Sequence, residues 1–177
     1  LIQENEQLLM LKTIKTGGCY KNHELFIAPE MISMGIEKTK HFDDLDAFPN
    51  LLKYKISKIT LWIGDSFTNV VNGIQITYKN LKDGSSFTTP KRLGGKGNII
   101  AVKEIELEDD EDIIAVSTRS GLVIDKIILK TSKGRTLEAG GIGGKAFEFP
   151  MKNRKVIGTY GGYDGWLHYI GFYTAPL

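Results

Sequence analysis

One cysteine, Cys19, is present among the 177 residues, so the chain cannot form an internal disulfide. The sequence also lacks any Asn-x-Ser/Thr acceptor for N-linked glycans. Both absences slightly favour a cytoplasmic over a secreted location, because secreted domains commonly carry such features. They leave the compartment itself open.

No apolar run is long enough to span a membrane, and no signal-peptide core is found. The chain begins at Leu1 rather than Met, so we expect it to be part of a longer polypeptide whose targeting signals can lie outside it. Neither charge sign dominates, since 23 Lys and Arg residues stand against 21 Asp and Glu residues. The lysines are interspersed with acids, which predicts no nucleic-acid partner.

The residues needed for a catalytic or metal centre are also scarce. The three histidines are far apart in the sequence: His23, His41 and His168. No GxSxG motif frames a serine nucleophile, and neither Gly94–Gly97 nor Gly140–Gly144 continues into the Lys-Ser/Thr and helix of a phosphate loop. We therefore predict no enzymatic activity, no catalytic residue, no metal and no cofactor.

An acidic run at positions 104–112 has two interpretations. A calcium loop would need glycine at its sharp bend, and glycine is missing here. Alternatively, the glutamates at 104, 106 and 108 alternate with Ile105 and Leu107, which predicts the solvent face of a strand followed by a turn. The second interpretation is favoured.

What the sequence does contain is a pattern stated three times. Val70–Tyr78 and Leu122–Thr131 are similar apolar segments, each followed by a turn and then by a glycine pair, Gly94-Gly95 and Gly140-Gly141. A third copy, Trp166–Thr174, lies near the end of the chain. Repetition at a regular interval indicates one supersecondary unit that buries its apolar face against copies of itself.

The repeated units have the period of β-strands. Lys55–Ile63, Lys103–Glu108 and Ile124–Leu129 are short, alternating and rich in β-branched residues. Asp83-Gly84 and Lys133-Gly134 separate apolar runs, as in hairpins whose turns need positive φ. We predict an all-β fold from about Leu51 onward.

The first part of the chain differs from the rest. The spacing of its leucines and isoleucines predicts a short amphipathic helix over Leu1–Lys15, ended by Gly17-Gly18. Glu30–Pro49 is expected to be a loop or a peripheral strand. We divide the chain into an N-terminal extension, residues 1–40, which packs on the remainder or on a neighbouring chain, and a domain over residues 41–177.

The glycine pairs, the repeated Ile-x-x-Ile and the final Ile170–Tyr173 make the chain resemble the jacalin-like lectin domain from about His41 onward. The resemblance implies a β-prism of three antiparallel Greek-key sheets with pseudo-threefold symmetry. It also implies sugar binding at a GxxxD loop beside a Gly-Gly loop. There the carboxylate accepts hydrogen bonds from sugar hydroxyls, backbone N–H groups donate to them, and glycines permit close approach.

The GxxxD motif is complete only in the second repeat, at Gly121–Asp125. The aligned positions read Asp164–His168 in the third repeat and Thr68–Asn72 in the first. Tyr163 and Trp166 could stack on a sugar ring or plug the end of the prism. The resemblance thus implies these carbohydrate-binding residues: Gly121, Leu122, Val123, Asp125, Gly140, Gly141, Asp164, Trp166 and His168.

Alternatives remain for the site and for the function. Asp125 could instead cap a turn or pair with Lys126 or Lys145. The domain is expected to be a carbohydrate-binding module whose partners are glycans, or a sugar-silent prism that serves as a structural or protein-interaction module for other protein chains. The intact Gly121–Asp125 loop favours the first function, and the two altered loops favour the second.

Overall fold

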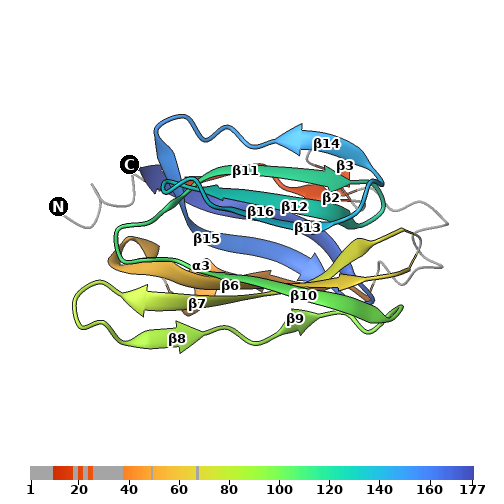
Figure 1. Cartoon of the computed structure of the whole chain (residues 1–177), viewed down its shortest axis with the longest axis horizontal. Helices are drawn as coiled ribbons and strands as arrows, with labels where there is room; N and C mark the ends of the chain where they lie inside the picture. The colour runs from red at the N-terminus through yellow and green to blue at the C-terminus, as the bar shows by residue number, and fades with distance from the viewer. Residues whose placement is uncertain (1–9, 18–19, 22–23, 26–37, 49, 67) are drawn as a thin grey trace.

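Three antiparallel sheets, each built on one long hairpin, pack around a common core in the computed structural model of the chain (Figure 1). The structure describes residues 10–17, 20–21, 24–25, 38–48, 50–66 and 68–177. The all-β prediction is confirmed. Within these ranges no helix is long and apolar enough to cross a membrane.

The first sheet follows the order β10-β6-β7-β8, and β9 also pairs with β7. Because the last strand returns to lie beside the first, this order is a Greek key. The glycine predicted to end its hairpin turn, Gly84, has φ +73°. The strands are β6 (Tyr54–Gly64), β7 (Val70–Asn80), β8 (Ser86–Thr88), β9 (Arg92–Leu93) and β10 (Ile99–Glu106).

The second sheet has the equivalent order, β13-β12-β11-β14. Its hairpin turn contains Gly134 with φ +77°, again as the sequence predicts. The strands are β11 (Ile113–Ser120), β12 (Ile124–Thr131), β13 (Thr136–Gly140) and β14 (Lys145–Glu148).

The third sheet is completed by strands from the first part of the chain. Its order is β1-β16-β15-β5, and β2 also pairs with β16. The edge strands β1 and β2 thus take the place that β13 has in the second sheet. The strands are β15 (Arg154–Tyr163), β16 (Leu167–Pro176), β5 (Lys40–Asp43), β1 (Leu11–Lys12) and β2 (Thr16–Gly17).

The helix predicted over Leu1–Lys15 is wrong for the part of it that the structure describes. Leu11 and Lys12 are extended and pair with Thr174 and Tyr173 of β16, because pairing with an open sheet edge overrides a weak helical period. Residues 1–9 lie outside the described residues, as does Gly18. Gly17 ends no helix but lies in β2.

The rest of the N-terminal region is short and irregular. β3 (Tyr20–Lys21) pairs with β4 (Glu24–Leu25). β5 is the peripheral strand expected within the 30–49 segment, and the one-turn helix α3 (Asp44–Ala47) and the 3-10 turn η2 (Leu51–Lys53) lead from it into β6. Residues 30–37 and 49 lie outside the described residues.

The core forms where the repeated isoleucines of the three sheets meet. Ile74 of β7, Ile127 of β12 and Ile170 of β16 are all buried, and each lies two residues after the last position of the aligned GxxxD segment. This agreement confirms the prism of three Greek-key sheets with pseudo-threefold symmetry. It also places the three aligned loops at one end of the prism.

Candidate functional site

The loops that join β6 to β7, β11 to β12 and β15 to β16 meet around a small apolar plug. Val70, Val123 and Trp166 pack together as one buried cluster. Each lies two residues before the last position of its aligned segment, so the plug obeys the pseudo-threefold symmetry of the fold. We call these three residues the end plug.

Glycines let the loop of one repeat pack closely on the loop of another. A Cβ atom at Gly141 would lie 2.5 Å from the carbonyl oxygen of Asn69, and one at Gly94 would lie 2.1 Å from that of Gly165. Both distances are too short for any side chain. The first repeat therefore contacts the second and the third at this end of the prism.

In the second repeat, the carboxylate of Asp125 lies in a cradle of glycines. A Cβ atom at Gly143 would lie 2.5 Å from Oδ1, and one at Gly144 would lie 2.6 Å from Oδ2. Burial raises the pKa of Asp125, and a hydrogen bond from the Gly121 backbone and the charge of Arg119 partly oppose this shift. Asp125 is 8% exposed.

The alternative in which Asp125 pairs with a lysine is not what the structure shows. Lys126 instead directs its Nζ to Glu138 Oε1 at 3.0 Å. Within the described ranges, no lysine or arginine forms an ion pair with Asp125. In the part of the chain that the structure describes, the carboxylate oxygens of Asp125 therefore take part in no ion pair.

Arg119 of β11 holds the glycine-rich loop in place. Its Nε donates to the carbonyl of Gly143 at 3.0 Å, and its Nη2 donates to that of Gly144 at 2.8 Å. On the other side, the N–H of Gly141 donates to the carbonyl of Asp125 at 2.8 Å. The cradle is therefore fixed by the protein before any ligand arrives.

In the first repeat, the aligned residue Asn72 uses its side chain to hold its own loop. The fully buried amide donates from Nδ2 to the carbonyl of Lys96 at 2.8 Å and to that of Gly94 at 3.4 Å. This amide lies inside the loop and offers no carboxylate to a ligand.

In the third repeat, the aligned residue His168 is fully buried. Its Nδ1 lies 2.7 Å from Oγ1 of Thr39. Burial lowers the pKa of His168 to about 4, and the charge of Asp164 opposes this shift only in part. The imidazole is therefore neutral at neutral pH.

The plug alternative fits the burial of Trp166. Its side chain is 5% exposed, and its Nε1 donates to Oγ of Ser66 in the first repeat. A ring enclosed in this way has no open face for a sugar. Val123 is likewise buried in the plug, whereas Leu122 beside it reaches the surface.

Two residues that lie against His168, Gly17 and Thr39, were missed in the sequence. Gly17 pairs with Tyr169 as Gly140 pairs with Lys126, so Gly17 is the third repeat's counterpart of Gly140. Its φ of +141° and the 2.2 Å between a Cβ atom there and the His168 carbonyl oxygen make glycine necessary. The sequence did contain a signal for Gly17. No glycine pair follows the third copy of the repeat, so the remaining strand of the third sheet has to come from the start of the chain. No signal pointed to Thr39.

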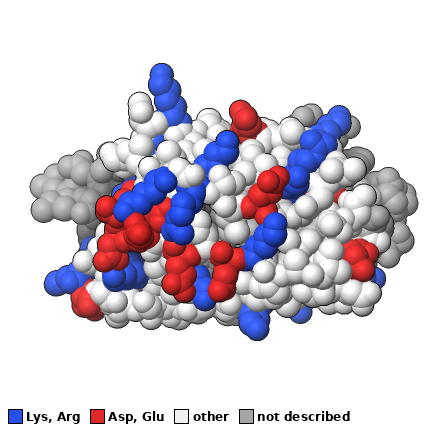
Figure 2. Space-filling view, viewed as in Figure 1, with Lys and Arg blue, Asp and Glu red and all other residues white. Residues whose placement is uncertain are grey.

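Acidic and basic side chains are intermingled on the face of the molecule shown in Figure 2. The acidic run contributes to this pattern. Glu104 of β10 pairs with Lys58 at 3.3 Å, and Asp109 pairs with Lys79 at 2.8 Å. Ile105 between the strand glutamates is buried, as the solvent-face interpretation predicts. Within the described ranges no group of His, Cys, Asp and Glu is arranged to hold a metal.

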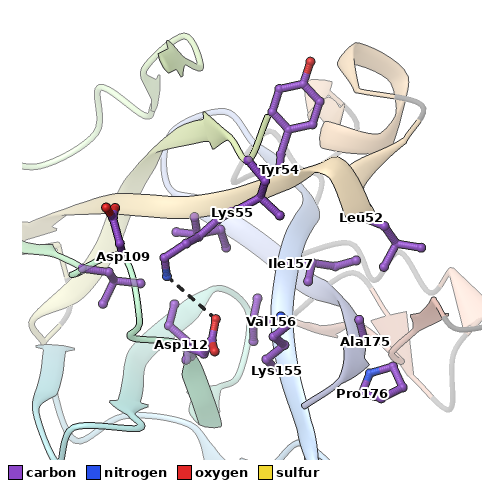
Figure 3. A pocket seen from close by; sticks show the side chains of 14 residues that line it. Leu52, Tyr54, Lys55, Asp109, Asp112, Lys155, Val156, Ile157, Ala175 and Pro176 are labelled. Carbon is purple, nitrogen blue, oxygen red and sulfur yellow. Dashed lines mark ion pairs between the residues drawn. The ribbon is translucent and has the colours of Figure 1, made fainter. Parts of the chain in front are cut away.

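A hollow of about 350 Å³ lies at the opposite end of the prism, where β6 and β15 begin and β16 ends (Figure 3). Lys55 points into it toward Asp112, with Nζ 3.8 Å from Oδ1, and also donates to the carbonyl of Glu111. Its other walls are largely apolar, including Val156 and Ile157. Lys55 and Asp112, the opposite charges that meet in this hollow, are thus paired with each other.

The sequence is similar to known sugar-binding proteins. The pattern that describes the jacalin-like lectin domain matches residues 33–173. A galactose-specific lectin of Morus indica is 32% identical over 111 residues, which cover 59% of this chain and 69% of the relative.

Solved structures show the same fold at lower identity. A mannose-specific jacalin-related lectin from Morus nigra, in complex with mannose, has a TM-score of 0.68 at 22% identity, with 94% of each chain covered. Malaysian banana lectin has a TM-score of 0.67 at 22% identity, with 94% of this chain and 99% of the other covered. Artocarpin in complex with mannotriose has a TM-score of 0.65 at 23% identity, with 93% and 99% covered.

Proposed function

The chain belongs to the family of jacalin-like lectin domains, and from this premise we propose that it binds carbohydrate through the Gly121–Asp125 loop of its second repeat. It is a carbohydrate-binding, lectin-like module. The ligand is a glycan, and no metal or cofactor takes part in the proposed binding. The residues proposed to form the site are Gly121, Leu122, Val123, Asp125, Gly140 and Gly141.

The observation that carries this proposal is the state of Asp125. Its carboxylate lies between Gly121, Gly143 and Gly144, and no ion pair within the described ranges uses it. The aligned positions in the other repeats hold an amide engaged by its own loop and a buried neutral imidazole. The second repeat is therefore the one that offers a charged acceptor.

The cradle supports sugar binding by simple chemistry. Two adjacent hydroxyls of a sugar can donate to the two carboxylate oxygens, and charge-assisted hydrogen bonds of this kind are about twice as strong as neutral ones. Backbone N–H groups of Leu122 and Val123 are proposed to donate to the same hydroxyl oxygens. The glycines leave room for the ring to approach.

The third loop has a smaller part in the proposal. Asp164 is half-buried, but His168 and Trp166 are enclosed by the protein. We therefore place the principal site in the second repeat, although the aligned loop of the third repeat occupies an equivalent position in the fold. The proposal predicts one principal sugar site per chain.

Titration calorimetry with methyl mannosides, glucosides and galactosides tests the proposal. In Asp125→Asn the charge is lost while the size is kept, so we expect affinity to fall about ten- to a hundredfold, or about 1.4 to 2.8 kcal/mol. Asp164→Asn makes the same change in the third loop and should leave affinity within about twofold. Equal binding by wild type and Asp125→Asn would contradict the assignment of the site.

A sugar-silent module for protein interaction is the second candidate function. It is supported by Asn72 and His168, which stand at the aspartate position of the motif in the other two loops and bond to the protein itself. A glycan array on the purified chain separates the two functions. Absence of binding to every glycan would favour the protein-interaction module.

A further inference from the structure

Equivalent residues of the three repeats bring charges to the hollow at the opposite end of the prism. Lys55 at the start of β6, Asp112 just before β11 and Lys155 at the start of β15 all line it (Figure 3). They are equivalent because the residue after each pairs with a position that lies six residues after the last position of the aligned GxxxD segment. The symmetry of the fold therefore places two lysines and one aspartate around this hollow. The pairs that show it are Ile56 with Tyr78, Ile113 with Thr131 and Val156 with Thr174.

These three charges do not balance one another. The Nζ atom of Lys55 lies 3.8 Å from Oδ1 of Asp112. Lys155 forms no ion pair in the part of the chain that the structure describes. The remaining charged residue of the lining, Asp109, is paired with Lys79 at 2.8 Å. The hollow thus has one ammonium group whose charge no carboxylate of its lining neutralises.

The charge of Lys55 is itself only partly compensated. Its side chain is 10% exposed. Burial lowers the pKa of Lys55, the charge of Asp112 opposes this shift, and the charge of Lys155 adds to it. An ammonium group has three N–H donors, and Lys55 directs one of them to the carbonyl of Glu111. An anion between Lys55 and Lys155 would therefore stabilise the charged form of both lysines.

The rest of the wall offers apolar surface to a ligand. It consists largely of aliphatic side chains, and Leu81 among them is 61% exposed. The N–H of Leu81 donates to the carbonyl of Lys53 at 3.0 Å, and that of Leu107 donates to the carbonyl of Ser57 at 2.8 Å, so the backbone of the wall is fixed. The volume of about 350 Å³ falls within the roughly 300 to 1,000 Å³ that is usual for small-molecule pockets. A preformed wall of this kind needs little ordering when a ligand binds.

We propose that the hollow binds a small organic acid whose carboxylate is attached to an apolar body, such as an alkyl chain of medium length. The carboxylate lies between the ammonium groups of Lys55 and Lys155, and the apolar body lies against the aliphatic wall. Charge-assisted hydrogen bonds hold the carboxylate, and removal of apolar surface from water stabilises the rest of the complex. This site is independent of the proposed sugar site, because the Gly121–Asp125 loop lies at the other end of the prism.

Titration calorimetry at neutral pH tests the inference with octanoate, octan-1-ol and acetate. We expect octanoate to bind about tenfold more tightly than octan-1-ol, because the alcohol has a chain of the same length without the charge. Acetate has the charge without the chain, so it should show no saturable binding. Equal affinities for octanoate and octan-1-ol, or no binding of octanoate, would overturn the inference.

Two matched variants assign the charge preference to Lys155. Lys155→Gln should lower the affinity for octanoate about five- to tenfold and leave that for octan-1-ol within about twofold. Lys152→Gln makes the same change at an exposed lysine in the preceding turn, outside the lining of the hollow, and should keep octanoate affinity within about twofold. Equal losses in the two variants would reflect the net charge of the protein and would overturn the assignment.

Asp112→Asn provides a change of the opposite sign. It removes the carboxylate that competes with the ligand for Lys55, so octanoate should bind about threefold more tightly. Weaker octanoate binding by a folded Asp112→Asn protein would overturn the placement of the carboxylate beside Lys55. The inference also fails if sedimentation shows a wild-type dimer that Leu81→Ser converts to monomer while neither protein binds octanoate. That result would make the hollow a contact between copies of the chain.

Discussion

The second and third repeats place their loops in equivalent positions but use them differently. In the second, the carboxyl group of Asp125 lies in a cradle of glycines, and the companion strand β13 follows directly in the chain. In the third, His168 is buried against Thr39, and the companion strand β2 comes from the start of the chain. The fold thus places the two loops equivalently, and the residue at the last aligned position determines whether the loop carries a carboxyl group or an imidazole.

The largest expected effect comes from removing the strands that complete the third sheet. We propose that residues 1–40 pack on the prism as an extension, since the N–H of Thr13 donates to the carbonyl of Phe172 at 2.8 Å and Tyr160 donates to the carbonyl of Thr13. Their deletion also removes Thr39. We expect a loss of roughly 4 kcal/mol from several backbone hydrogen bonds of about 1 kcal/mol each.

Urea denaturation measures this loss, and calorimetry shows whether the second repeat still binds sugar. We expect one cooperative transition at lower urea and unchanged sugar affinity. A truncated chain without a cooperative transition would show that the division between residues 40 and 41 is wrong.

The next effect separates packing from binding in the end plug. Trp166→Ala leaves a cavity against Val70 and Val123, so we expect a loss of about 3 to 4 kcal/mol of unfolding free energy in urea. Val123→Ala removes less volume and should cost about 1 to 2 kcal/mol. If Trp166→Ala is as stable as wild type, the plug is not what holds the three loops together.

A pH titration sharpens the contrast between the two repeats. The pKa of His168 is lowered to about 4 from an ordinary value near 6.5, so the unfolded chain binds the proton more tightly than the folded one. The contribution of neutral His168 to the free energy of unfolding is therefore fully present above pH 6.5, and it is lost as pH falls from 6.5 to 4. We expect a loss on the order of 2 kcal/mol across this range.

The control for this titration is His168→Asn, which cannot take up the proton. Its unfolding free energy should depend less on pH between 6.5 and 4 than that of wild type. If both proteins lose stability equally on acidification, another group is responsible.

The smallest effect concerns the stability that Asp125 costs. Burial raises the pKa of Asp125, so ionisation of this carboxyl group is less favourable in the folded state than in the unfolded state. An ionised Asp125 therefore lowers the free energy of unfolding. Asp125→Asn should therefore be as stable as wild type or more stable by about 0.5 to 1 kcal/mol at pH 7. The gain should vanish near pH 3, where the wild-type carboxyl is protonated. Destabilisation by Asp125→Asn at pH 7 would mean that the carboxylate supports the loop.

The sequence was sufficient to predict the parts of the fold that local pattern determines. The isoleucine spacing and the turn glycines Gly84 and Gly134 predicted strands and hairpins, and Gly121–Asp125 marked the loop that keeps a carboxylate. Contacts between distant segments were harder. Thr39 reaches His168 across 129 residues, and the glycine pair beginning at Gly17 had the appearance of a helix end.

Side-chain direction was the other limit. Trp166 and Leu122 both belong to hairpin loops, yet one is enclosed and the other reaches the surface. The sequence therefore permits two opposite interpretations of Trp166, because the residues that enclose it belong to the other two repeats. The end plug forms only when all three loops are brought together.

The end plug also gives the molecule a built-in optical reporter. The chain has two tryptophans, and Trp166 packs on Val123, two residues from Asp125, while Trp62 lies on the first sheet beneath the ammonium of Lys91. A change in the second loop that shifts Val123 alters the surroundings of the Trp166 indole. Emission from a Trp62→Phe protein would then follow ligand arrival in one repeat through a fluorophore that belongs to another.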